Sequence, residues 1–134
     1  MSTINDLAKA LRESIPGQPS FARYDGIEPP ANAKPPWIIT SVTGRGLEES
    51  EPHRLTAMQS KLTARIVGLT EDQVNFAAHV MLMGIMTAEC DGFVIGAPVF
   101  YSDSGAYAAG MTSSDTARRY PVRVIEWHVT WSWK

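Results

Sequence analysis

The residues of this chain that could perform chemistry are three histidines and one cysteine. His53, His79 and His128 fall in segments with the patterns of a loop, a helix and a strand, and no H-x-x-x-H or C-x-x-C spacing occurs. Zinc sites are typically marked by such closely spaced ligands. The sequence therefore predicts no metal site. We expect His79 to be a packed or interfacial side chain and His128 to belong to the polar face of a strand.

The other candidate motifs also favour a protein without catalytic residues or a cofactor. Cys90 precedes Asp91 and Gly92, but a nucleophilic thiol needs a nearby base and a lowered pKa, so we interpret it as a semi-buried thiol after a helix. The "TGRG" of residues 43–46 lacks G-x-G-x-x-G spacing and leads into acidic residues that would repel phosphate. The "DSG" and "SSD" of the segment 102–119 lack the alternating ligands of a calcium loop.

Length and composition favour a single domain spanning residues 1–134. The chain is 44% hydrophobic and 19% charged, which is ordinary for a globular protein. Its net charge of −2 provides no basic field for nucleic acid or an acidic membrane. One cysteine fits a reducing compartment, and neither a membrane-spanning run nor a signal-peptide pattern is found. We expect a soluble protein made in the cytoplasm, with no membrane partner and no sequence-specific nucleic-acid partner.

The elements that must position these residues follow from hydrophobic periodicity and turn residues. In chain order we expect an amphipathic helix over 3–15, a proline-rich extended loop over 16–36, a strand over 37–44, a hairpin loop over 43–52, a strand over 54–67, a helix over 71–87, a strand over 93–101 with a bulge or edge at Gly96 and Pro98, a polar loop over 102–119 and a final strand. This α-β-β-α-β-β order predicts an α+β domain with a four-stranded, mostly antiparallel sheet and two helices packed on one face.

Local patterns are clearest in the second helix and in the strand before it. Thr70 and Gln73 are placed for a capping box, and Leu69 and Val74 for a hydrophobic staple. In the strand 54–67 one parity is apolar and the other polar, which indicates a half-buried antiparallel strand. The residues expected to face inward there are Met58, Leu62, Ala64 and Ile66.

The sequence ends in its most aromatic stretch, "PVRVIEWHVTWSWK". Its odd positions are apolar without a break and include Trp127, Trp131 and Trp133, so one face should pack against other elements. An acidic chain whose polar parity lacks a run of Lys and Arg does not favour base stacking by these rings. Trp133 is harder to bury because chain ends fray, and we expect strand pairing or a neighbouring subunit to hold it.

With these elements in order, the chain resembles the tail terminator proteins of long-tailed bacteriophages. The resemblance rests on the opening helix, "PPWIITSV", "SKLTARIVGLTEDQVNFAAHVM", the late loop rich in Ser, Asp and Gly, and "RYPVRVIEWHVTW". It implies a non-enzymatic virion protein that forms a ring, usually of six subunits, on the completed tail tube. The ring stops tube polymerisation and joins the tail to the head connector. It implies assembly in the host cytoplasm, partners in the tail tube and connector proteins, and DNA passing through the ring lumen.

A ring requires two different patches that meet on neighbouring subunits. The candidates for a subunit or tail interface fall in three places. The acidic loop contains Arg45, Glu48, Glu49 and Glu51, the basic run contains Arg118, Arg119 and Tyr120, and the last tryptophans are Trp131 and Trp133. Pairing of the acidic loop with the basic run would make charge reversal at Arg118 and Arg119 block ring formation. Two alternatives stay open: a head-closure or connector-adaptor neck protein, and a small-ligand-binding or enzymatic α+β domain whose site forms in an oligomer.

Overall fold

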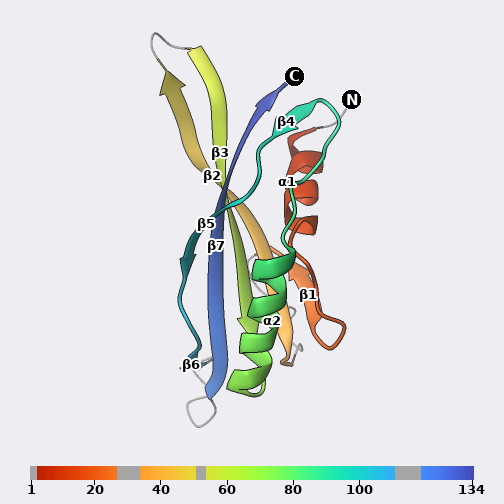
Figure 1. Ribbon diagram of the computed structural model, residues 1–134, viewed down its shortest axis with the longest axis vertical. Coiled ribbons are helices and arrows are strands. Elements are labelled where there is room, and N and C mark those ends of the chain that lie inside the picture. Colours follow the sequence, from red (N-terminus) through yellow and green to blue (C-terminus); the bar gives the residue numbers. More distant parts are fainter. Residues whose placement is uncertain (1–2, 27–33, 51–53, 111–118) are drawn as a thin grey trace.

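The computed structural model describes residues 3–26, 34–50, 54–110 and 119–134. Its elements, in chain order, are α1 (Ile4–Glu13), β1 (Ala22–Asp25), β2 (Trp37–Ser50), β3 (Arg54–Val67), α2 (Glu71–Gly84), β4 (Phe93–Ile95), β5 (Val99–Asp103), β6 (Tyr107–Gly110) and β7 (Arg119–Trp133). In Figure 1, β5, β6 and β7 lie to the left of the two helices, whereas β1 and β4 lie on the same side as the helices.

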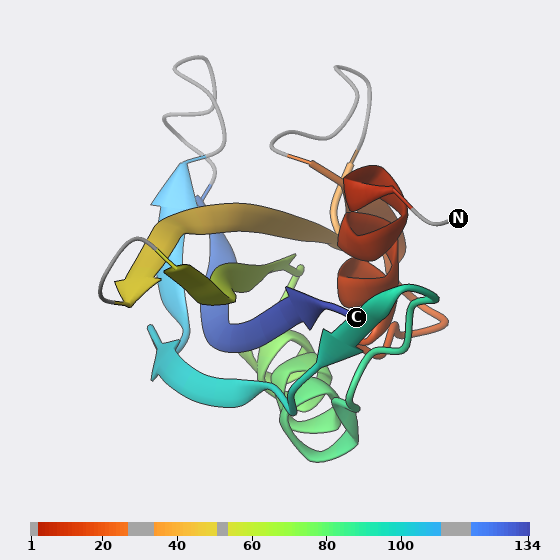
Figure 2. The ribbon, with the colours of Figure 1, turned by 90° about the horizontal axis from the view of Figure 1, so that it is seen from above.

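All seven strands belong to one mixed sheet that is organised around β7. The strand order is β1-β2-β3-β7-β4, and β5 and β6 also pair with β7. One edge of β7 pairs with β3 from Val122 to Trp131, and the other edge pairs in turn with β6, β5 and β4. Only the β1–β2 pair is parallel among the described strands. Seen from above, the sheet is strongly curled (Figure 2).

The predicted α+β domain, with a four-stranded, mostly antiparallel sheet and two helices packed on one face, is therefore wrong: the described chain is mostly β, a curled, mixed sheet of seven strands with two helices. Two segments taken as loops contain short strands: β1 lies in the proline-rich segment and β6 in the polar segment 102–119. Strands of four residues carry too little alternation to be recognised, and their pairing partners are far away in the sequence. The predicted strand 93–101 is two strands, because β4 ends at Ile95 and β5 begins only at Val99, although the Gly96 N–H still donates to the Thr130 carbonyl of β7 at 2.8 Å.

The predicted hairpin loop over 43–52 is also wrong in its first part, because β2 continues to Ser50. Its pairing with β3 shifts register between Gly44 and Leu47 and again between Glu48 and Glu49. Pairing of β3 with β7 begins only at Met58. Residues 48–50 and 54–57, which we call the hairpin arm, therefore pair only with each other within the described residues, and the arm projects beyond the body of the sheet (Figure 1).

Both helices begin at threonine caps. Thr3 and Asp6 form a reciprocal capping box at α1, in which the Thr3 N–H donates to Asp6 Oδ2 at 2.8 Å. At α2 the predicted cap is confirmed, since Thr70 Oγ1 accepts from the Gln73 N–H, but the Gln73 side chain accepts from the Leu69 N–H rather than from Thr70. The helix ends at Gly84, three residues before the predicted end, because Ile85 is extended.

The main core is one buried cluster to which the curled sheet and both helices contribute. The predicted inward parities of β3 and β7 are confirmed, with Leu62, Ala64, Ile66, Ile125 and Trp127 all buried. They pack with residues of both helices in one cluster, which includes Leu7, Leu11, Val74, Ala77, Ala78 and Met81. The opposite face of the sheet carries a smaller cluster of four buried residues, namely Trp37, Ile39, Val67 and Val122.

The C-terminal tryptophans share one parity of β7 but differ in burial. Trp131 is buried, and its indole N–H donates to Ser60 Oγ at 2.9 Å. Trp133 is 55% exposed, although it pairs with Phe93 of β4 as expected and its ring meets that of Trp131 edge-on at 5.0 Å. Strand pairing within the chain thus holds this end.

This difference gives a matched test on a single strand. Trp127→Ala should lower the free energy of unfolding by about 3–5 kcal/mol, because it empties a fully buried site. Trp133→Ala should lower it by about 1 kcal/mol, since it removes only ring contacts at an exposed position. Urea unfolding of both variants measures this, and equal losses would contradict the described burial.

Candidate functional site

The histidines and the cysteine do not converge. His79 is exposed on α2, His53 lies outside the described residues and His128 belongs to a polar network on β7. Among the described residues no group of three His, Cys, Asp or Glu side chains could hold a metal ion. Cys90 is half-buried and lines an open pocket of about 550 Å³ together with Thr87, Ala88, Glu89, Asp91, Phe93, Ile95 and Lys134. Neither described histidine lines this pocket.

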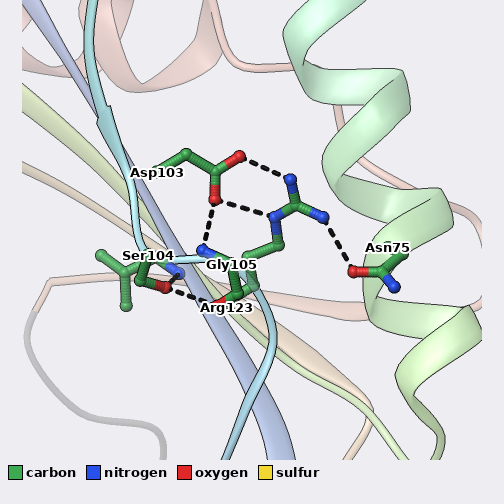
Figure 3. A network of polar contacts seen from close by, with 6 residues as sticks. Asn75, Asp103, Ser104, Gly105 and Arg123 are labelled. Carbon is green, nitrogen blue, oxygen red and sulfur yellow. Dashed lines mark hydrogen bonds and ion pairs between the residues drawn. The ribbon is translucent and has the colours of Figure 1, made fainter.

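The first polar network joins α2, the end of β5 and the start of β7 around one guanidinium (Figure 3). Arg123 donates twice to the Asp103 carboxylate, through Nε at 2.8 Å and Nη2 at 2.5 Å, and once to Asn75 Oδ1 at 2.8 Å. These bonds hold the pKa of Asp103 below its usual value against the effect of burial, and the Gly105 N–H assists at 2.9 Å. Asp103 in turn raises the pKa of Arg123. The network clamps the β5–β6 turn to the helix.

The second polar network lies on the opposite face of the sheet. Glu126 accepts from Lys61 at 3.2 Å and lies 2.8 Å from His128 Nε2, and the His128 ring stacks on Tyr101 with centroids 4.0 Å apart. Burial raises the pKa of Glu126, but the bonds from His128 and Lys61 outweigh it, and the net shift is downward. In both networks each carboxylate is paired with a neighbouring cationic or imidazole side chain. This is the arrangement expected of networks that stabilise a fold.

The charged residues predicted as interface candidates are separated by the fold. Arg45, Glu48 and Glu49 lie on β2 at or near the hairpin arm, whereas Arg119 begins β7 at the other end of the long axis (Figure 1). Glu49 is paired with Leu55 of β3, and Val67 at the end of β3 is paired with Val122 of β7. The path along the strands from Leu55 to Val67 and on from Val122 to Arg119 is about 40–50 Å long at a rise of ~3.3 Å per residue. Glu51 and Arg118 lie outside the described residues.

The other candidates lie along β7. Tyr120 is half-buried against the smaller apolar cluster, Trp131 is part of the main core, and Trp133 is exposed. Of these three side chains, Trp133 therefore offers the most surface to a partner.

Sequence reasoning missed most of the exposed apolar surface. Single exposed apolar side chains are normal on a protein surface, but here eleven large ones are exposed among the described residues. They are Ile4, Leu69, Phe76, Met83, Met86, Val94, Val99, Phe100, Tyr101, Tyr107 and Trp133. One signal was available for the helix. The run "VNFAAHVMLM" is apolar on nearly all sides, so a helix that buries one stripe must expose Phe76 and Met83.

All four tyrosines lie on the sheet face that points away from the helices. Tyr24 and Tyr120 pack against the smaller cluster there, Tyr107 is directly opposite Val122 of that cluster, and Tyr101 stacks on His128. Directly paired residues share a face of a sheet. We call this surface, with the adjacent Val99 opposite His128, the tyrosine face.

Comparison with known proteins adds no relative: no protein-family model matches the chain, and no curated protein sequence is significantly similar to it. Within the described residues, no helix has the length and apolar character needed to cross a membrane.

The Arg123 network predicts a pH-dependent contribution to stability. Because the folded pKa of Asp103 is lowered, its contribution is present above the unfolded pKa of about 3.9 and is lost as the pH falls through the folded value. Asp103→Asn should therefore lower the free energy of unfolding by about 2 kcal/mol at pH 7. The difference from wild type should shrink below about pH 4. Urea unfolding across pH tests this.

Asp91→Asn is the matched control, because Asp91 is exposed in a turn. Its free energy of unfolding should stay within about 0.5 kcal/mol of the wild-type value both at pH 7 and below about pH 4. A loss in Asp103→Asn that is the same at every pH would count against the ion pair as its source.

Proposed function

We propose that this chain is a structural tail terminator, a virion protein that caps the completed tail tube of a long-tailed bacteriophage as a homo-oligomeric ring and joins it to the head connector. The observation that carries the proposal is that exposed apolar side chains lie on opposite faces of one small domain, on α2 and on the tyrosine face. Two different patches on opposite faces suit a heterologous contact, and such contacts form a ring when the rotation between neighbouring subunits closes. The order of sequence motifs quoted above supports the same proposal.

In this proposal the charged residues serve the partners at the two ends of the ring. The hairpin arm and Arg119 lie at opposite ends of the long axis (Figure 1). Subunits that stand side by side in the ring would keep the two ends of their long axes apart. The hairpin arm, with Glu48 and Glu49, and the basic run would then face different proteins. One rim then meets the tail tube and the other the connector, while DNA passes through the lumen.

The ring itself is tested by native mass spectrometry of the full chain over a range of concentrations. We expect a discrete species at about six times the chain mass of 14.7 kDa. A retained small molecule on a monomer or dimer would instead support a ligand-binding domain. A bare monomer at all concentrations, with no effect on tail-tube length, would contradict the proposal.

The charged ends are tested by the double variant Arg118→Glu and Arg119→Glu. We expect the ring to form and its binding to one axial partner to be lost, because Arg119 begins β7 at the opposite end of the long axis from the hairpin arm (Figure 1). Native mass spectrometry measures the ring, and sedimentation with polymerised tail tubes or purified connector measures docking. A double variant that folds but forms no ring would support charge pairing between subunits instead. Connector binding without tube binding by the wild type would favour a head-closure protein.

A further inference from the structure

The outer surface of α2 and the tyrosine face each gather several exposed apolar side chains. On the first, Phe76 and Met83 are seven residues apart and share one stripe of the helix, and Met86 follows just after the helix end; they are 58%, 76% and 70% exposed. On the second, Val99, Tyr101 and Tyr107 are 64%, 59% and 44% exposed. Exposed apolar patches of this kind are typical of surfaces that bind another protein.

The two surfaces point in opposite directions. Trp127 of β7 points into the core that the buried residues of α2 also form, so Phe76 and Met83 lie on the far side of that layer. His128, the next residue on β7, points the other way, and Tyr101 stacks on it. One copy can therefore present the outer surface of α2 to one neighbour and the tyrosine face to another.

We propose that the tyrosine face of one copy packs against the outer surface of α2 of a second copy. The proposal rests on the ring proposed above and assigns the surfaces that close it. The contact is heterologous, so repeating it adds subunits until the ring closes.

The exposed area is sufficient for such a contact. With about 200 Å² for a whole large side chain, the six residues expose about 700 Å² together. Protein interfaces are about 57–65% apolar, so burying these side chains corresponds to an interface of about 1,100–1,300 Å² in total. That exceeds the roughly 1,000 Å² expected of a specific interface.

The residue types and charges of the two surfaces are complementary. Phe and Met side chains pack favourably on tyrosine rings through edge-to-face and sulfur–aromatic contacts. The first turn of α2 adds exposed Glu71 and Asp72. The tyrosine face carries Arg65, opposite Val124, while Lys61, opposite His128, is already paired with Glu126 of the same face. The positive charge of Arg65 facing Glu71 and Asp72 at the rim favours this pairing over helix against helix.

Two double variants test the contact. Phe76→Gln with Met83→Gln alters only the outer surface of α2 and keeps good helix formers. Tyr101→Thr with Tyr107→Thr alters only the tyrosine face and keeps good strand formers. Each should remain folded by circular dichroism, and each alone should be monomeric where the wild type forms a ring. Mixed in equal amounts they should form a heterodimer and nothing larger, since each supplies one intact surface. Native mass spectrometry resolves these species by mass.

The matched control is Ile4→Gln with Val94→Thr, which removes exposed apolar groups elsewhere and should leave the ring intact. A wild type that stays monomeric at all concentrations and has no effect on tail-tube length would overturn both the ring and this contact. Rings formed by either double variant would overturn the contact alone and leave the ring standing. A mixture that stays monomeric would show that the two surfaces do not meet. Nucleic acid bound to the wild-type ring and lost from a still-assembled Tyr101→Thr, Tyr107→Thr ring would assign the tyrosine face to nucleic acid.

Discussion

Strand β7 must be hydrogen-bonded along both edges over most of its length, and the rest of the structure depends on this constraint. One edge takes β3, and the other takes β6, β5 and β4 in succession. Because side chains alternate along a strand, β7 also fixes which residues face each layer. The side chains of Trp127 and the alternate residues on its side of β7 pack in the core with both helices. The side chains of His128 and the residues on its side of β7 contribute to the tyrosine face and to the Glu126 network. A strand paired on both edges can be this apolar without offering an edge to aggregation.

The parts of the fold that could be predicted from sequence are those whose pattern repeats within one element. The strand 54–67, the start of α2 at Thr70 and the alternation of β7 are of this kind. The strands β1 and β6 could not be predicted, because four residues show no period and their partners lie elsewhere in the chain. The polar residues 45–50 read as a loop, although in the structure their backbone continues a two-stranded ladder. Local composition does not reveal pairing of that kind.

The candidate site shows the same division. Charged runs are visible in a sequence, so Glu48, Glu49 and Arg119 could be proposed, but their separation to opposite ends depends on the register of β2, β3 and β7. The four tyrosines come from β1, β5, β6 and β7, and only pairing brings them to one face. A surface assembled from four strands carries no signal in any single segment. The outer surface of α2, by contrast, was readable from its all-round apolar sequence.

The paired indoles at the end of β7 give the chain an optical property of its own. Trp131 and Trp133 stand 5.0 Å apart at 70° to each other, close enough for their electronic transitions to couple. Coupled chromophores at a fixed angle produce a paired circular-dichroism band that vanishes when the angle is no longer fixed. The end of β7 beside β4 therefore carries an intrinsic reporter of its order, which can be followed during assembly without any label.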